Sequence, residues 1–114
     1  MFNLDNEART WKHIEELVDE TLARYKTTLE EDLDILERDE EAKEECKLGA
    51  IKRNCIIYRK NEKLILYFLK VCANKFHRLV KMKRSDALVE IESWNYLDEN
   101  CKAYFRELCN LLTE

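Results

Sequence analysis

Hydrophobic and polar positions alternate along most of the chain with spacings of three and four residues, the pattern of amphipathic helices. The first such segment runs from about Asn6 to Lys26. Its apolar stripe consists of Ala8, Trp11, Ile14, Val18, Leu22 and Tyr25, and charged side chains occupy the opposite face. Large aromatic side chains in such a stripe are usually part of the core. We therefore interpret Trp11 and Tyr25 as core anchors rather than as a platform for a ligand.

A second helix is predicted to begin near residue 28. Thr28 followed by Glu31 is a capping box, in which the hydroxyl accepts from the N3 amide and the glutamate reaches back to the cap amide. Thr27 with Glu30 gives the same motif one residue earlier, so the boundary is uncertain by one residue. Glu30, Glu31 and Asp32 also lie at the positive end of the helix macrodipole. We interpret these three acids as capping residues rather than as a metal site.

A third, long helix is predicted from about Glu41 to Met82, because no helix breaker interrupts this stretch. Residues 37–47 are dense in charge and are interpreted as a connection or as the exposed start of this helix. Residues 64–73 are apolar on nearly every side, and helices of that kind are buried. The sequence therefore predicts that residues 64–73 form the centre of a helical bundle.

A last helix is predicted over about residues 87–112, where apolar residues again follow threes and fours. Ser85 and Asp86 are good N-cap residues for it. Ser93 or Asn95 could begin a separate helix, which leaves a break there open. The predicted fold class is all-α, with about four helices in a bundle, one long central helix and a single domain over residues 1–114.

The composition supports this fold class and excludes several kinds of site. The 114 residues contain no proline and one glycine, Gly49. Turn-rich β-folds need more of both residues, and glycine-rich phosphate loops need at least two glycines. The longest apolar run, from Leu64 to Leu69, is too short to span a bilayer, which takes about 20 residues. We expect no membrane partner.

Five cysteines occur without a CxxC spacing, at positions that fit apolar helical patterns: Cys46, Cys55, Cys72, Cys101 and Cys109. An odd number in such positions indicates reduced, buried thiols rather than a disulfide framework. Residues 1–10 lack the apolar segment of a signal peptide. The expected location is therefore the cytoplasm, with the nucleus as an alternative.

Charge is distributed unevenly along the chain. Residues 1–50 hold 7 basic and 16 acidic side chains, residues 51–84 hold 11 and 1, and residues 85–114 hold 2 and 7. The basic stripe of the middle segment consists of Lys52, Arg59, Lys60, Lys63, Lys70, Arg78, Lys81 and Arg84. Such a stripe either pairs with the acidic flanks or binds an acidic partner. Internal pairing is favoured over nucleic-acid binding, because the chain is acidic as a whole.

No constellation of residues indicates autonomous catalysis. His13 and His77 are the only histidines, and neither has cysteine or aspartate at a metal-ligand spacing. Cys72 and His77 lie about 140° apart on a helix and would not meet. We predict no catalytic residue, no cofactor-binding residue and no metal ligand in this chain.

Three blocks of sequence resemble one family. They are the segment from Tyr25 to Asp32 with Leu36 four residues on, the segment from Arg59 to Leu66, and Asp5-Asn6-Glu7 followed by Trp11. The first two resemble the C-terminal substrate-binding domain of SET-domain methyltransferases of the Rubisco large-subunit type. The third is similar to the branch that methylates a histidine of actin. The resemblance is clearest over residues 5–69.

The resemblance implies an all-helical lobe that packs beside a SET domain and helps to hold a protein substrate. Arg59, Glu62 and Lys63 match the family motif, although Asn61 stands where the family has glycine. The stretch between Leu36 and Cys55 is longer and more acidic than the family pattern. With Lys70, these three motif residues are the expected partner or interdomain contacts, acting through pairing and not through chemistry.

The sequence shows none of the motifs of a SET domain, so the resemblance covers the substrate-binding lobe alone. The expected function is a non-catalytic lobe that binds a protein substrate, of the actin-histidine or protein-lysine type, and not an enzyme by itself. An actin-like protein or a SET domain is the expected partner. Two alternatives remain open: a helical homodimer or scaffold module, and a nucleic-acid binder using the basic stripe.

Overall fold

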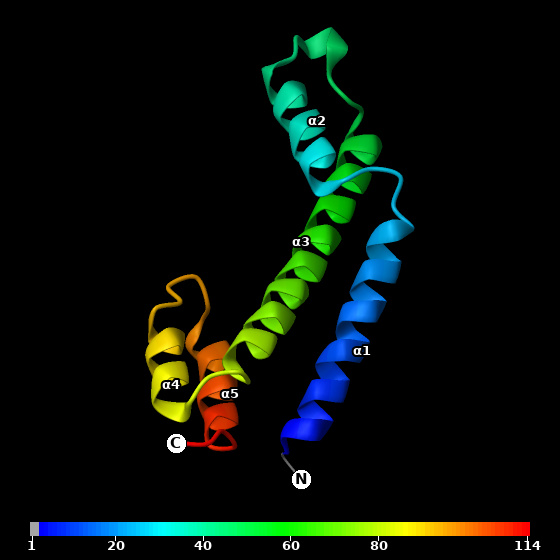
Figure 1. Cartoon of the computed structure of the whole chain (residues 1–114). Helices are drawn as coiled ribbons and strands as arrows, with labels where there is room; N and C mark the ends of the chain where they lie inside the picture. Colours follow the sequence, from blue (N-terminus) through cyan, green and yellow to red (C-terminus); the bar gives the residue numbers. More distant parts are fainter. Residues whose placement is uncertain (1–2) are drawn as a thin grey trace. The chain divides into compact units, whose positions relative to one another are not determined.

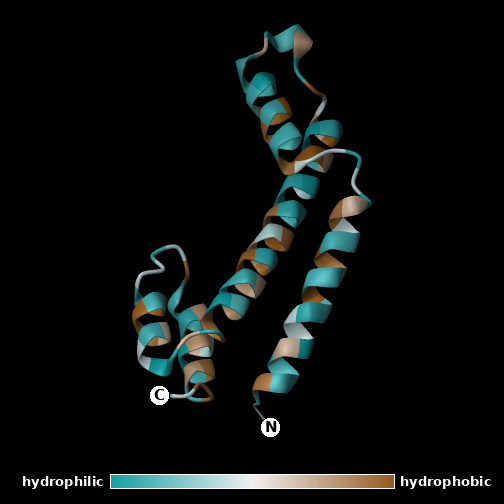
Figure 2. Cartoon of the chain, in the orientation of Figure 1, coloured by the Kyte–Doolittle hydropathy of each residue, from teal (hydrophilic) through white to brown (hydrophobic). Residues whose placement is uncertain are grey.

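The computed structural model describes residues 3–114, and over that range the chain forms α-helices, one short 3-10 helix and no strand (Figure 1). The elements are α1 (Leu4–Ala23), α2 (Leu29–Glu41), the 3-10 helix η1 (Glu44–Cys46), α3 (Ala50–Leu79), α4 (Arg84–Glu92) and α5 (Glu99–Cys109). Hydrophobic and hydrophilic residues alternate around α1 and α3 in Figure 2, as amphipathic helices require. The prediction of an all-α fold with one long helix is confirmed.

The chain divides into two compact units. The first unit contains the chain up to Glu15 together with Val71–Glu114, and the second contains Glu16–Lys70. Helices α1 and α3 therefore contribute residues to both units.

The first unit has a continuous apolar core. Its buried members are Cys72, Phe76, Leu79, Ala87, Ile91, Trp94, Leu97, Phe105, Leu108, Cys109 and Leu112. Trp11 packs against this cluster, with its ring centroid 6.3 Å from that of Phe76 and 6.5 Å from that of Phe105. The prediction that Trp11 is a core anchor is confirmed.

Trp11 also begins a short chain of hydrogen bonds at the edge of this core. Its indole Nε1 donates to the hydroxyl of Tyr104 at 2.8 Å, and that hydroxyl donates to the Glu7 carboxylate at 2.5 Å. Burial raises the pKa of Tyr104, and the hydrogen bond to Glu7 raises it further. The bonds satisfy the polar ends of both aromatic side chains.

The last predicted helix is two helices in the structure. Helix α4 ends at Glu92 and α5 begins at Glu99, so the break left open near Ser93 is real. The Ser93 hydroxyl donates to the carbonyl of Glu90 at 2.6 Å, and the Asp98 side chain caps α5 by accepting from the Cys101 amide at 2.8 Å. Local side-chain bonds to the backbone thus separate the two helices.

The prediction that Ser85 and Asp86 are N-caps is wrong, because α4 begins at Arg84 and both residues lie inside its first turn. A tertiary contact sets this boundary. The Arg84 amide donates to the carbonyl of Thr113 at 2.8 Å. The Arg84 guanidinium donates to the carbonyls of Cys109, Asn110 and Leu112. This arginine satisfies the carbonyl of the last residue of α5 and carbonyls of the residues that follow it, so long-range bonds override the local capping preference.

The long helix begins later than predicted, at Ala50 rather than near Glu41. The residues between α2 and α3 form η1 and flanking loop, and none of the three residues of η1 is buried. Charge-rich sequence with no apolar face to bury gains little from a helical conformation. The Asp39 side chain instead accepts from the Leu48 amide at 2.6 Å and closes the loop.

The prediction that residues 64–73 form the buried centre of a bundle is wrong for its first part. Leu64, Ile65, Tyr67 and Phe68 expose between 40% and 62% of their surface, whereas Cys72 and Ala73 are buried. Apolar residues on every side of a helix require neighbours on every side. The pattern along the sequence cannot tell whether those neighbours lie within the same chain.

The expectation of buried thiols holds for some of the cysteines only. Cys72 and Cys109 are buried and Cys101 is half-buried, but Cys46 and Cys55 are exposed. All five are free thiols. Burial is the main cause that raises the pKa of Cys72 to about 11. Of the helices formed by residues 3–114, none combines the length and apolarity needed to cross a membrane.

We predict that Phe105→Ala lowers the free energy of unfolding of the first unit by about 3–5 kcal/mol, because Phe105 is buried among Trp11, Trp94 and Tyr104. Tryptophan fluorescence during urea unfolding measures this, since both tryptophans contact Phe105. Val89→Ala, at an exposed site of α4, is the control and should change the value by less than about 0.5 kcal/mol. Equal effects of the two substitutions would contradict the placement of the core.

Candidate functional site

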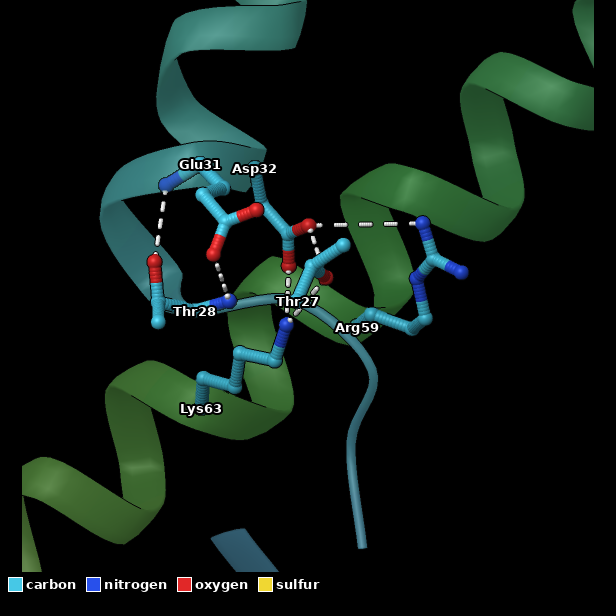
Figure 3. Close-up of polar contacts among 6 residues, drawn as sticks. All are labelled: Thr27, Thr28, Glu31, Asp32, Arg59 and Lys63. Carbon is cyan, nitrogen blue, oxygen red and sulfur yellow. Dashed lines mark hydrogen bonds and ion pairs between the residues drawn. The ribbon is translucent and has the colours of Figure 1, made fainter. Parts of the chain in front are cut away.

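The second unit is organised around a buried ion pair between α2 and α3 (Figure 3). Lys63 of α3 is 1% exposed and Asp32 of α2 is fully buried. The Lys63 ammonium donates to Oδ2 of Asp32 at 2.5 Å and to the Thr27 hydroxyl at 2.9 Å. The Thr27 hydroxyl donates to Oδ1 of Asp32 at 2.6 Å. Every charged atom of the pair therefore has a partner, as a buried pair requires.

The capping box at the start of α2 positions Asp32. The Glu31 amide donates to the Thr28 hydroxyl at 3.1 Å, and the Thr28 amide donates to the Glu31 carboxylate at 3.2 Å. The prediction of Thr28 as the N-cap is confirmed. Thr27, which offered the same motif one residue earlier, binds Asp32 and Lys63 instead. The cap fixes the first turn so that Asp32 points toward α3.

Two further motif residues lie beside the pair. Arg59 is one turn before Lys63 on α3, and its guanidinium lies 4.0 Å from Oδ1 of Asp32. The Lys63 ammonium also lies 4.8 Å from the centre of the Tyr25 ring, a cation–π distance. A hydrogen bond with Glu62, together with burial, raises the pKa of Tyr25 to about 12. The segment before α2 thus contacts α3 through Tyr25 as well as through Thr27.

The charge state of Asp32 follows from its partners. Burial alone would raise the pKa of this carboxyl group. The hydrogen bonds from Lys63 and Thr27, with the charges of Lys63 and Arg59, outweigh burial and hold the pKa of Asp32 below its ordinary value. Asp32 is therefore an ionised acceptor at neutral pH and not a proton donor for chemistry.

A second ion pair joins the other end of α2 to the start of α3. Asp39 is buried and accepts from the Arg53 guanidinium at 3.0 Å, in addition to its bond with the Leu48 amide. Asp32 and Asp39 are two helical turns apart, and their partners Lys63 and Arg53 follow in reverse order along α3. The two pairs therefore set α2 antiparallel to the first half of α3, as Figure 1 shows. We call this element the α2–α3 hairpin.

The structure places the predicted site residues in two groups. Arg59, Glu62 and Lys63 lie together around Asp32 and Tyr25. Lys70 lies two turns further along α3 and contacts Asp19 of α1 at 2.8 Å. Arg59 and Lys70 are each about two-fifths exposed, whereas Lys63 is buried. The arrangement joins helices through charges and holds no nucleophile beside a base.

Sequence reasoning missed the acidic half of the hairpin. The capping pattern accounts for Asp32 only as an acid of the first turn of α2, and no pattern points to the pair of Asp39 with Arg53. A signal did exist, because Asp32, Leu36 and Asp39 have the spacing of a single helix face and all three are buried. Acids placed in line with a buried leucine indicate an inward-facing charge that needs a basic partner.

Five of the eight residues of the basic stripe have acidic partners within the chain. Besides Arg59, Lys63 and Lys70, these are Arg78 with Glu90 and Arg84 with Glu114. The interpretation of internal pairing is confirmed for these five residues. His77 contacts Glu15, and residues 3–114 contain no group of His, Cys, Asp and Glu side chains that could hold a metal ion.

The fold and the hairpin define an all-helical module in which the buried polar groups connect helices to one another. A model of the Rubisco LSMT substrate-binding family matches residues 1–66, more than half of the chain. The chain therefore belongs to this family, which is the non-catalytic substrate-binding domain of a methyltransferase family. The matched range includes both ion pairs of the hairpin. No curated protein and no solved structure matches the chain.

We predict that Lys63→Met alone lowers the free energy of unfolding by about 3–5 kcal/mol, because it leaves the Asp32 carboxylate buried without its counter-charge. The double variant Asp32→Leu with Lys63→Met should recover most of this loss, since apolar side chains fill the same space. Urea unfolding followed by circular dichroism measures both. Lys52→Met, at an exposed site of α3, is the control and should stay within about 0.5 kcal/mol. A double variant as unstable as Lys63→Met would contradict the buried pair.

The lowered pKa of Asp32 predicts a loss of stability in acid. A group whose pKa is lower in the folded than in the unfolded chain stabilises the fold above the unfolded value, and this contribution disappears as the pH falls through the folded value. The free energy of unfolding should therefore fall as the pH decreases below about 4. Asp32→Asn should lose less stability over that range, measured by urea unfolding at several pH values. Glu37→Gln, on the exposed side of α2, is the control, and an unchanged pH profile in Asp32→Asn would overturn the prediction.

Proposed function

We propose that this chain is the protein-substrate-binding lobe of a SET-domain methyltransferase of the actin-histidine or protein-lysine type. The observation that carries the proposal is the family match over residues 1–66, which contains α2, the first half of α3 and both ion pairs between them. The resemblance of Asp5-Asn6-Glu7 and Trp11 to the actin-histidine branch supports the finer assignment. Methyl transfer itself belongs to a SET domain that acts together with this lobe.

The hairpin provides the rigid support that such a lobe needs. A binding surface keeps its affinity when it is preorganised, because less conformational entropy is lost on association. Helix α2 is held at its first turn by Asp32 and near its last turn by Asp39. Lys63 is too buried to reach a substrate, so its role in the proposal is to position α2. Arg59 and Lys70 remain accessible enough to contact a partner or a neighbouring domain.

The outer side of α2 is the surface that we assign to the substrate. Its exposed residues include Glu30, Asp34, Glu37, Glu40 and Glu41. Asp34 pairs with Arg38 of the same helix and Glu40 pairs with Arg53. The other acids of this face attract a basic protein segment and steer its approach. The proposed substrate therefore presents lysine or arginine side chains close to the residue that is methylated.

Isothermal titration of actin into the chain tests the proposal. We expect saturable binding that weakens as salt is added, because screening reduces the attraction between exposed charges. The double variant Glu37→Lys with Glu41→Lys should weaken binding by at least about tenfold. Asp86→Lys, at an exposed acid of α4 outside the hairpin, is the control and should leave the affinity unchanged. Absence of binding, both for the chain alone and with an actin-histidine-type SET domain added in trans, would refute the actin assignment.

A further inference from the structure

The second unit has a shallow groove on α3, beside the buried ion pair. The residues that line it form two neighbouring rows, one of Ile51, Cys55 and Arg59 and one of Asn54 and Tyr58. The members of each row are four residues apart, which is the spacing of side-chain ridges on a helix. The groove has a volume of about 510 Å³ and is open to solvent, since Ile51 is 83% and Tyr58 69% exposed. We call it the Arg59 groove.

The polar groups of the Arg59 groove have no hydrogen-bond partner in the part of the chain that the structure describes. The Asn54 amide and the Tyr58 hydroxyl make no such bond. One terminal nitrogen of Arg59 lies 4.0 Å from Asp32, beyond hydrogen-bond distance, and Nε of Arg59 is buried without an acceptor. The other terminal nitrogen points away from Asp32 in Figure 3. The groove therefore presents hydrogen-bond donors that the chain leaves unmet.

Asp32 does not neutralise Arg59 fully, because its carboxylate is engaged elsewhere. The Lys63 ammonium donates to one oxygen of Asp32 at 2.5 Å, and the Thr27 hydroxyl donates to the other at 2.6 Å. A guanidinium binds a carboxylate best through two parallel hydrogen bonds, and Arg59 makes neither of them with Asp32. Arg59 thus retains the capacity to bind a second carboxylate.

The surroundings of the groove supply no other acid. None of the residues that line it is acidic, and Glu62 is the single acid of residues 51–84. Glu62 is engaged by the Tyr25 hydroxyl. Lys52 is exposed and lies two helical turns before Arg59 on the same side of α3, and within the described residues it has no acidic partner. The groove therefore has a cationic edge beside its apolar residues.

We propose that the Arg59 groove binds an acidic segment of a protein partner. Arg59 binds an aspartate or glutamate carboxylate of this segment through its terminal nitrogens, the geometry that a planar guanidinium favours. A neighbouring apolar side chain of the segment packs against Ile51 and Tyr58, and Lys52 attracts further negative charge. This site is separate from the basic segment assigned to α2, so either assignment can fail without the other.

The groove fits a protein segment better than a nucleic acid. Ile51 and Tyr58 provide apolar contact area, and aromatic residues are enriched at protein interfaces. Lys52 and Arg59 are the cations of this edge, whereas a nucleic-acid-binding protein commonly neutralises about 6–10 phosphates. The chain also has a net charge of −4, which opposes the approach of a polyanion.

Selection of binders from a library of random short peptides, with the unmodified chain as bait, is the first test. We expect the enriched peptides to carry aspartate or glutamate next to an aromatic or aliphatic residue. Enrichment of peptides without an acid would overturn the proposal, and so would a selection that enriches nothing. The isolated peptides then serve as the probes for the two experiments that follow.

The thiol of Cys55 reports whether a peptide occupies the groove. Cys55 is exposed and lines the groove, whereas Cys46 is exposed on η1 outside it. A saturating acidic peptide should slow alkylation of Cys55 by a maleimide at least about tenfold and leave Cys46 unchanged, because covered thiols react slowly. Mass spectrometry of proteolytic fragments measures each site. Unchanged alkylation of Cys55, or protection by an oligonucleotide instead of the peptides, would overturn the proposal.

Substitutions identify the groups that bind the peptide. Arg59→Gln should weaken binding at least about tenfold in isothermal titration, while Arg24→Gln, at an exposed arginine of α1, should leave it unchanged. Because Arg59 lies near Asp32, Ile51→Glu provides a variant that leaves the ion pair intact. It places an acid in the groove and should weaken binding to a similar extent, with Val89→Glu on α4 as its control. An affinity that survives both Arg59→Gln and Ile51→Glu would overturn the proposal.

Discussion

The buried ion pair between Asp32 and Lys63 is the interaction on which the second unit depends. A charge removed from water destabilises a protein unless a counter-charge and hydrogen bonds replace the lost hydration. Here Thr27 satisfies both partners, and the capping box at Thr28 holds the turn that carries Asp32. Because the geometry works in only one register of α2 against α3, the pair determines the orientation of the hairpin as well as its stability.

The features that the sequence predicted well are those fixed by neighbouring residues. Helical periodicity located the helices, and the spacing of Thr28 and Glu31 identified the start of α2 to the residue. The features that it predicted poorly depend on contacts between distant residues. Helix α4 begins at Arg84, rather than being capped by Ser85, because Arg84 binds C-terminal carbonyls nearly thirty residues away. Those bonds have no signature in the local pattern.

The site shows the same division. The blocks that resemble the family contain Asp32, Arg59 and Lys63, but neither periodicity nor spacing states which acid pairs with which base. Residue type also predicts burial wrongly for polar and for apolar side chains here. The acid Asp32 is buried, while the apolar Ile65 is exposed. Hydrophobicity favours the burial of a side chain but does not determine which segment or which protein covers it. An apolar stretch on all sides of α3 therefore fits an association surface as well as a core.

Amide hydrogen exchange at residues 29–41 tests most directly whether the Asp32–Lys63 pair holds the hairpin together. If it does, the amides of α2 are protected to a similar degree as those of the first half of α3, since the two helices open together. Lys63→Met then removes the protection of α2 first, while the amides of α5 keep theirs. Rapid exchange throughout α2 in the unmodified chain, or protection of α2 that survives Lys63→Met unchanged, would contradict the central role of the pair.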